Sequence, residues 1–302
     1  MLAQWLRILV LGQIMLGAGM GYLLFRTGFA AAWALPVLAL GLPFLTLILV
    51  VLGTAILSKA NEPMRMWRRS VLGEIRACST TFLLRQPWTK IPPRLLPATT
   101  STAKVPVVLV HGYLCNHRLW ADVAAKLRAN GHAVYAVNLE PLFTSIDHYA
   151  PIVEQAVEAL CVHAQVSQVA LVGHSMGGLA IRAWMRAYGH HRAARVITLG
   201  TPHAGTQMAR HTFTPNGRQM GWKSPWLADL ASSESKEVRD LKRIAITAQD
   251  NIVYPQRAQV LADVTLKVFE GIGHVAMCLH PPVIQWVADQ LNDVALTPAV
   301  PR

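Results

Sequence analysis

A serine stands between two glycines in the sequence GHSMG, residues 173–177, directly after the apolar run Val169–Val172. Glycine is used where the backbone turns tightly or where a neighbouring element comes close. A helix-like stretch follows, so Ser175 lies at a junction between a strand and a helix. Two interpretations are open at this point: an ordinary turn, or a strained elbow that holds a reactive hydroxyl in the open. The second needs a base and an orienting acid elsewhere in the chain, because a serine hydroxyl alone is a weak nucleophile.

A histidine and an aspartate further along the chain meet this need. The chain has 12 histidines, but His274 follows a strand-like run in a segment where Gly271 and Gly273 allow a flexible turn. Asp250 also follows a strand-like run, and the order serine, aspartate, histidine is the one expected after such an elbow. The alternatives are a turn-forming aspartate and a loop histidine bonded to the backbone. Three rival acids follow no predicted strand closely: Asp229, Asp240 and Asp263. We therefore predict Ser175 as nucleophile, His274 as base and Asp250 as its acid.

A second junction between a strand and a loop, at His111–Gly112–Tyr113, can supply donors for a developing oxyanion. Gly112 lets the backbone curl toward the serine, so we predict the backbone N–H groups of Tyr113 and Met176 as the donor pair. His111 is expected to bond within its loop. His174, at the variable position of the elbow, is expected to serve packing rather than catalysis.

Predicted strands and helices, which must position these residues, alternate regularly along the chain from residue 105 onward. Short β-branched runs predict strands, and longer stretches between them predict helices. This pattern favours a mostly parallel sheet covered by helices on both faces, with sites beyond the carboxyl ends of the strands. The expected strands are Val105–Val110, Ala133–Asn138, Val169–Val172, Arg195–Leu199, Ile244–Ala248 and Leu266–Phe269. The expected helices are Leu119–Ala129, Tyr149–His163, Gly178–Tyr188 and Pro282–Leu291.

Residues 201–242 interrupt this alternation, since they contain no clear strand and are long for a plain connection. Trp222, Trp226 and Leu227 are apolar residues in what should be an exposed segment. Two interpretations stay open: a lid or acyl-binding cap over the site, or a surface subdomain with its own small core.

The front of the chain is far more apolar than a soluble domain. Hydrophobic residues make up 53% of the sequence and charged residues only 15%, with long uncharged runs at Ile8–Phe25 and Phe29–Leu57. A membrane-spanning helix needs about 20 apolar residues, so two spanning helices are predicted. A cleaved signal peptide and a buried core helix are the alternatives. Pro36 and Pro43 are tolerable in a membrane helix and would kink it. Basic residues after the second run, beginning with Lys59, outnumber the lone Arg26 between the runs and predict a cytoplasmic location for the rest of the chain.

The net charge of +12 reflects many basic residues between Lys59 and Arg94. Beside a membrane helix, such residues are attracted to anionic head groups. No nucleic-acid module is recognisable. Met64–Leu84 is predicted as an amphipathic helix along the membrane, followed by a Pro-rich linker. The four cysteines are far apart and suggest neither a zinc site nor a disulfide framework.

These motifs together resemble the α/β-hydrolase family, more narrowly its bacterial lipase-like and esterase-like members. The resemblance covers about residues 105–292. It rests on His111–Gly112, GHSMG at 173–177, GTPHAGT at 200–206, Asp250–Val253 and Gly273–His274, which occur in the family's order. It implies an α/β-hydrolase fold, the triad Ser175, Asp250 and His274, and the oxyanion donors Tyr113 and Met176. His111, Gly112, Gly173 and Gly177 are implied as supporting residues. GTPHAGT resembles the segment that leads lipases into their lid.

The resulting expectation is a bacterial inner-membrane serine hydrolase that cleaves esters of lipids or lipophilic acyl compounds, with no metal or organic cofactor. A thioesterase or acyltransferase on the same residues is the alternative, and a non-catalytic membrane scaffold is a third. The expected partners are the membrane and a lipid or lipophilic ester, with no nucleic acid and an open oligomeric state. The expected divisions are a hairpin at 1–60, a basic helix and linker at 61–104, the catalytic domain at 105–292 with the lid or cap at 201–242, and a tail at 293–302.

Overall fold

A seven-stranded sheet forms the centre of the C-terminal domain in a computed structural model that describes residues 1–299. The strands lie in the order β1-β3-β2-β4-β5-β6-β7. All neighbours pair in parallel except β1, which is antiparallel to β3. The bounds are β1 Leu95–Leu96, β2 Lys104–Val110, β3 His132–Ala136, β4 Val169–His174, β5 Ala193–Leu199, β6 Lys242–Thr247 and β7 Thr265–Phe269. The predicted mostly parallel sheet is confirmed, and the two-residue strand β1 was not expected.

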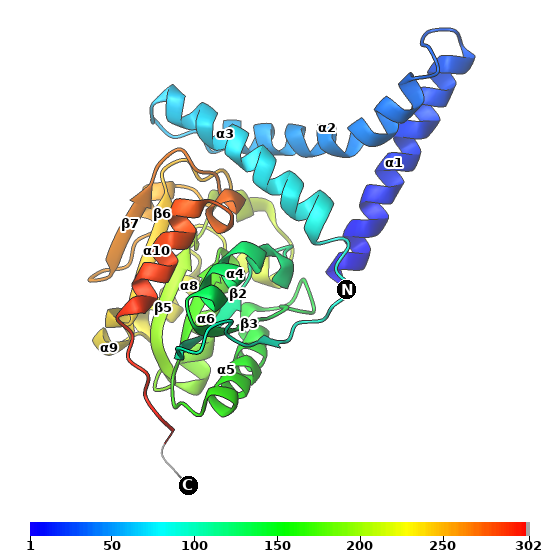
Figure 1. Ribbon diagram of the computed structural model, residues 1–302. Coiled ribbons are helices and arrows are strands. Elements are labelled where there is room, and N and C mark those ends of the chain that lie inside the picture. The colour runs from blue at the N-terminus through cyan, green and yellow to red at the C-terminus, as the bar shows by residue number, and fades with distance from the viewer. Residues whose placement is uncertain (300–302) are drawn as a thin grey trace.

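Helices cover both faces of this sheet, as the alternation predicts. On β2, Val107 and Leu109 pack in one apolar cluster, whereas Val108 and Val110 pack in another on the opposite face. The first cluster includes α4 (Ala121–Ala129) and α10 (Pro281–Asn292). The second includes α5 (Ala150–Ala164) and α6 (Met176–Tyr188). Successive strand residues point to opposite faces, so one strand contributes to both clusters and the domain has three layers (Figure 1).

Residues 201–242 pack against the face of the sheet that carries α6. They form α7 (Pro215–Gln219), α8 (Pro225–Ser232) and α9 (Lys236–Asp240). Leu227, Leu230 and Val238 are buried in the same cluster as α6. A buried ion pair joins Arg182 of α6 to Glu234 at 2.7 Å, and Lys242 also pairs with Glu234. The segment is therefore held to the sheet by apolar contacts and by buried charge.

Two long apolar helices precede the domain, α1 (Leu2–Arg26) and α2 (Ala34–Leu57). Both are long and apolar enough to cross a membrane, and only 17% of the most apolar window of each is buried. A core helix of a soluble protein would be mostly buried. A Cβ on Gly17 or Gly21 would overlap the backbone of α2, so the helices are in backbone contact near their connecting loop. Figure 1 shows α2 running beside α1 at that end and turning away further along, consistent with Pro43 inside the helix.

The helix α3 (Met64–Cys78) continues into a π-helix at Ser79–Arg85, and together they match the predicted juxtamembrane helix. Its buried residues recur at helical spacing, namely Ser70, Val71, Glu74, Ala77 and Cys78. Arg65, Arg68 and Arg69 are exposed on the other side. Figure 1 shows α2 and α3 crossing the molecule at one end of the sheet. That end is the one where β2, β4, β6 and β7 are followed by the residues of the candidate site.

Candidate active site

Ser175 occupies a strained elbow between β4 and α6. Its φ is 54° and its ψ is −129°, a backbone conformation that side chains other than glycine rarely adopt. A Cβ on Gly173 would lie 2.6 Å from the backbone nitrogen of Gly178, and a Cβ on Gly177 would overlap the carbonyl oxygen of Val110. Glycine is required at both positions because strand and helix approach so closely. The structure thus favours the elbow over the ordinary turn.

The loop after β2 lies directly against this elbow. A Cβ on Gly112 would lie 2.7 Å from the Cβ of Ser175, so the loop can approach the serine only with glycine there. Within residues 1–299, the backbone N–H groups of Tyr113 and Met176 donate no hydrogen bond to a protein acceptor. Met176 is the first residue of α6, where an N–H has no partner inside the helix. Both predicted donors therefore lie in segments next to Ser175, and their role as oxyanion donors stays a prediction.

His111 fixes this loop through both ring nitrogens. Its Nε2 accepts the backbone N–H of Leu139 at 3.0 Å, so its Nδ1 carries the proton and donates to the carbonyl of Gly112 at 2.8 Å. Burial lowers the pKa of His111 to about 4. The imidazole therefore stays neutral at physiological pH and keeps both bonds.

Asp250 and His274 meet beyond the ends of β6 and β7. The Nδ1 of His274 lies 2.8 Å from Oδ2 of Asp250, and both residues are buried. The other oxygen of Asp250, Oδ1, accepts the backbone N–H groups of Ile252 and Val253 at 2.9 and 2.7 Å. The carboxylate is therefore fixed by its own turn, and its free oxygen orients the imidazole so that Nε2 is available to act as a base.

The backbone of His274 is held on both sides. Its N–H donates to Oδ1 of Asn251 at 3.1 Å, and its carbonyl accepts Nε2–H of His174 at 3.1 Å. The two imidazole rings lie 4.5 Å apart between centroids. Burial and His274 together lower the pKa of His174 well below its usual value, so that ring remains uncharged. His174, which we expected only to pack, also supports the position of His274.

Three effects act on the pKa of His274. Burial lowers it, but the charge and hydrogen bond of Asp250 and the charge of Glu74 raise it more, so the pKa lies above its usual value. The negative charges of Asp250 and Glu74 therefore favour the protonated form of His274 despite its burial. Gly200, in the GTPHAGT segment, has a φ of 56°, and its Cβ would lie 3.2 Å from both Oδ2 of Asp250 and Nδ1 of His274. The absence of a side chain there leaves room for this pair.

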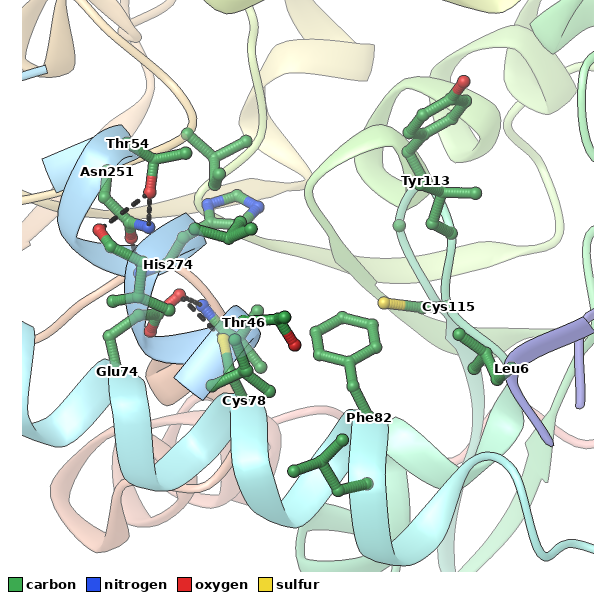
Figure 2. Close-up of a pocket in the computed structure, with 18 of the residues that line it drawn as sticks. Leu6, Thr46, Thr54, Glu74, Cys78, Phe82, Tyr113, Cys115, Asn251 and His274 are labelled. Carbon is green, nitrogen blue, oxygen red and sulfur yellow. Dashed lines mark hydrogen bonds between the residues drawn. The ribbon is translucent and has the colours of Figure 1, made fainter. Parts of the chain in front are cut away.

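Glu74 of α3, which was not predicted as a site residue, lies beside the loop that carries His274 (Figure 2). Its Oε1 accepts the backbone N–H of Val275 and its Oε2 accepts that of Ala276, each at 2.9 Å. Burial raises the pKa of Glu74, while the two N–H donors and His274 act in the opposite direction. Glu74 is the only acidic residue of an otherwise basic helix, and this was the one available signal in the sequence.

Residues of α2 also contact the catalytic loops. Nδ2 of Asn251 donates to Oγ1 of Thr54 at 3.0 Å, as Figure 2 shows, and the same Asn251 holds the N–H of His274. Nε2 of Gln256 donates both to the carbonyl of Ser58 and to that of Asp250, at 2.8 Å each. Thr54 of α2 and its C-cap residue Ser58 are thus linked, each through one intervening side chain, to His274 and Asp250.

A cavity of about 480 Å³ connects these residues to the apolar hairpin. Ser175, His274 and Tyr113 line it on the side of the domain, and residues of α1, α2, α3 and the π-helix line the rest. Its volume lies within the range of about 300–1,000 Å³ that is usual for small-molecule sites. No residue of 201–242 is among those that line it. The cover of the cavity comes from α1, α2, α3 and the π-helix, and the interpretation of 201–242 as a lid or cap stays a prediction.

The structure brings Ser175 and His274 to the same cavity, although no hydrogen bond joins their side chains among residues 1–299. A buried imidazole oriented by a carboxylate, a serine at a strained elbow that lines the cavity, and neighbouring backbone N–H groups are the parts needed for acyl transfer through a covalent intermediate. In the part of the chain that the structure describes, no group of three or more histidine, cysteine, aspartate or glutamate residues is placed to hold a metal ion.

Comparison with known proteins gives concordant matches. The model of the palmitoyl protein thioesterase family matches residues 106–261. Triacylglycerol lipase of Pseudarthrobacter phenanthrenivorans is 32% identical over 120 residues, which are 37% of this chain and 37% of that protein. Triacylglycerol lipase of Burkholderia plantarii is also 32% identical over 120 residues, which are 37% of this chain and 33% of that protein. The match therefore spans well under half the length of these curated relatives.

Solved structures share the fold at lower sequence identity. The mature form of Bacillus licheniformis lipase BlEst2 superposes with a TM-score of 0.54 at 17% identity, over 66% of this chain and 99% of that one. Aspergillus fumigatus lipase B superposes with a TM-score of 0.51 at 16% identity, over 68% of this chain and 57% of that one. These likenesses agree with the predicted α/β-hydrolase fold. The matched family region, residues 106–261, contains Ser175 and Asp250, whereas α1, α2, α3 and the segment that carries His274 lie outside it.

Proposed function

The chain belongs to the palmitoyl protein thioesterase family and is a hydrolase of the lipase and esterase type, and from this premise we propose that it is a membrane-anchored serine hydrolase. Its proposed substrates are carboxylic esters of lipids or lipophilic acyl compounds. The observation that carries the proposal is the convergence of Ser175 and the His274–Asp250 pair on one cavity walled by apolar helices.

In the proposed mechanism, Oγ of Ser175 attacks the acyl carbonyl carbon while Nε2 of His274 takes the hydroxyl proton. Asp250 holds the resulting imidazolium through Nδ1 at 2.8 Å. The N–H groups of Tyr113 and Met176 bind the oxyanion. His274 then returns the proton to the leaving alcohol, and an acyl group remains on Ser175. Water, activated by the same imidazole, releases the acid and restores the serine.

Membrane anchoring is part of the proposal. The hairpin α1–α2 exposes large apolar side chains along its length, including Trp5, Met15, Leu40 and Leu49. A soluble monomer rarely exposes so large an apolar surface, which a bilayer would cover. The start of α1 and the end of α2 both adjoin the domain, so the domain lies at one end of the hairpin. There the basic face of α3 would meet anionic head groups. We place the domain on the cytoplasmic side of a bacterial inner membrane, with the boundaries of hairpin, linker and catalytic domain given above.

A thioester substrate is the second candidate, and the family to which residues 106–261 belong favours it. A thiol, with a pKa of about 8.5, leaves as an anion far more readily than an alcohol. Oxygen and sulfur esters of one acyl group, assayed on the same preparation, separate the two candidates. The thioesterase is favoured if the ratio of kcat/KM for the sulfur ester over the oxygen ester exceeds the ratio of their uncatalysed hydrolysis rates.

Labelling by a fluorophosphonate probe tests the proposed nucleophile. Wild-type protein in detergent is expected to label and to hydrolyse a p-nitrophenyl ester, and Ser175→Ala is expected to do neither. Ser232→Ala, at an exposed serine of α8, is the matched control and should behave as wild type. Labelling that persists in Ser175→Ala would show that another residue is the nucleophile.

A further inference from the structure

The cavity follows one face of each apolar helix. On α1, its lining residues Leu6, Leu9, Val10 and Gln13 recur at intervals of three and one. On α2, the lining residues follow the same intervals, namely Pro43, Thr46, Leu47, Val50, Val51 and Thr54. Such spacing describes a continuous stripe on a helix. The eleven steps along the helix from Pro43 to Thr54 correspond to about 16 Å at a rise of 1.5 Å per residue. The cavity is therefore an elongated, mostly apolar channel that leads away from Ser175.

The channel is closed at its far end. Gly17 and Gly21 bring α1 into backbone contact with Leu38 and Leu35 of α2, which leaves no space between the helices there. Just before this contact, Nε2 of Gln13 donates to Oγ1 of Thr46 at 3.0 Å across the hairpin. An apolar chain that broke this bond would leave two partly buried polar groups unpaired between apolar helices. The Gln13–Thr46 bond therefore lies near the far end of the channel, one helical turn before Pro43.

The channel is open at its side. Val10 and Val51 are buried, but Leu9 of α1 and Val50 of α2 also line the cavity and are 57% and 64% exposed. Residues that both line a cavity and remain exposed mark its mouth. This mouth lies between the two apolar helices, where an inserted hairpin would be surrounded by lipid.

We propose that α1 and α2 form the acyl-chain site of this enzyme, and that the chain of a lipid resident in the bilayer enters it sideways between Leu9 and Val50. This rests on the proposed function, because it takes Ser175 as the nucleophile. The substrate class is then a membrane lipid or membrane-attached acyl compound whose ester group reaches Ser175 while its chain lies toward the Gln13–Thr46 bond.

Sideways entry has a physical advantage over entry from water. Moving a methylene from an apolar phase into water is unfavourable by about fourfold in the equilibrium constant. A long chain that crossed water would accumulate this factor for each methylene. A chain that passes from lipid directly into an apolar channel meets a similar environment throughout, so the barrier to entry stays low for long chains.

A tryptophan at the mouth tests the proposal. Full-length Val50→Trp and Leu9→Trp, reconstituted in phosphatidylcholine vesicles, are assayed with p-nitrophenyl palmitate and p-nitrophenyl butyrate. Each variant is expected to lower the ratio of kcat/KM for palmitate over butyrate by about tenfold or more, because excluding two methylenes costs about fourfold each. Leu49→Trp is the matched control, since Leu49 is 59% exposed and does not line the cavity, and its ratio should equal that of wild type.

The outcomes separate this proposal from the proposed function. Fluorophosphonate labelling of Ser175 in each variant shows that the site has folded. If all variants label and hydrolyse both esters but the ratio is unchanged, or if Leu49→Trp changes it equally, the acyl site lies elsewhere and the hydrolase assignment stands. If wild-type protein neither labels nor hydrolyses either ester, the proposed function fails and this proposal fails with it.

Discussion

Replacing Glu74 with glutamine tests whether the juxtamembrane helix positions His274. The two carboxylate oxygens of Glu74 accept the N–H groups of Val275 and Ala276, each at 2.9 Å. Glutamine has one carbonyl oxygen, so one of these buried N–H groups would face an amide NH₂ instead. Leaving a buried donor unsatisfied costs about 1–3 kcal/mol, which corresponds to about 5- to 150-fold in the equilibrium between a placed and a displaced histidine loop.

The same substitution changes the charge around the imidazole. Burial lowers the pKa of His274, and the charges of Asp250 and Glu74 raise it above its usual value. Removing the charge of Glu74 removes one of the raising effects, so the pKa of His274 must fall. The base acts in its neutral form, so the acid limb of kcat/KM should move to lower pH. We therefore expect Glu74→Gln to reduce the plateau of kcat/KM by about 5- to 150-fold while extending activity toward lower pH.

The assay is the pH profile of p-nitrophenyl butyrate hydrolysis by the full-length protein in detergent, across the range in which histidine titrates. Glu62→Gln is the matched control, because Glu62 lies in the same juxtamembrane segment and pairs at 2.8 Å with the exposed Arg257. It should leave both plateau and acid limb unchanged. A Glu74→Gln profile that overlays the wild-type profile, or an equal shift in Glu62→Gln, would refute the reasoning.

Two further substitutions test other parts of the account. Asp250→Asn should lower kcat by about 10⁴-fold, as the corresponding change does in serine-protease triads, because the amide favours the wrong tautomer of His274; steady-state kinetics measures this. Glu234→Ala should lower the free energy of unfolding by about 3–5 kcal/mol, because it leaves the buried charges of Arg182 and Lys242 without a partner; urea unfolding in detergent measures this.

The substitutions Asp250→Asn and Glu234→Ala each have a matched control. Asp229→Asn removes a carboxyl that is far more exposed than that of Asp250, and its kcat should match wild type. Lys236→Ala breaks an exposed pair with Asp240 and should change the free energy of unfolding by less than about 1 kcal/mol. An Asp250→Asn enzyme with nearly full kcat, or a Glu234→Ala protein as stable as Lys236→Ala, would contradict the corresponding assignment.

Local patterns were sufficient to predict most of the sheet. Each of the six expected strands overlaps an observed one, because short β-branched runs between helix-like stretches leave few alternatives in a parallel sheet. The elbow was predictable from the two glycines that flank Ser175, although the close contact that requires Gly177 is made with Val110 of the neighbouring strand β2. Asp250 and His274 each follow a predicted strand. Because the carboxyl ends of parallel strands lie at the same edge of a sheet, the two residues could be predicted to lie close together.

Contacts between distant parts of the chain were not predictable in the same way. Glu74 lies 201 residues before the Val275 N–H that it binds, and Thr54 lies 197 residues before Asn251. Their roles depend on how α2 and α3 dock over the strand ends, which no periodic pattern records. For residues 201–242, Trp226 and Leu227 revealed an apolar face but not that this face packs beside α6.

The most direct test of the central claim is to look for the covalent intermediate itself. Full-length protein is mixed with a palmitoyl ester or thioester, quenched in acid during turnover, digested, and analysed by mass spectrometry. The account predicts a palmitoyl mass increment on the peptide that carries Ser175, present in wild type and absent from Ser175→Ala. An acyl group found on a different residue, or turnover in wild type with no acyl-enzyme under any quenching time while Ser175→Ala remains active, would contradict it.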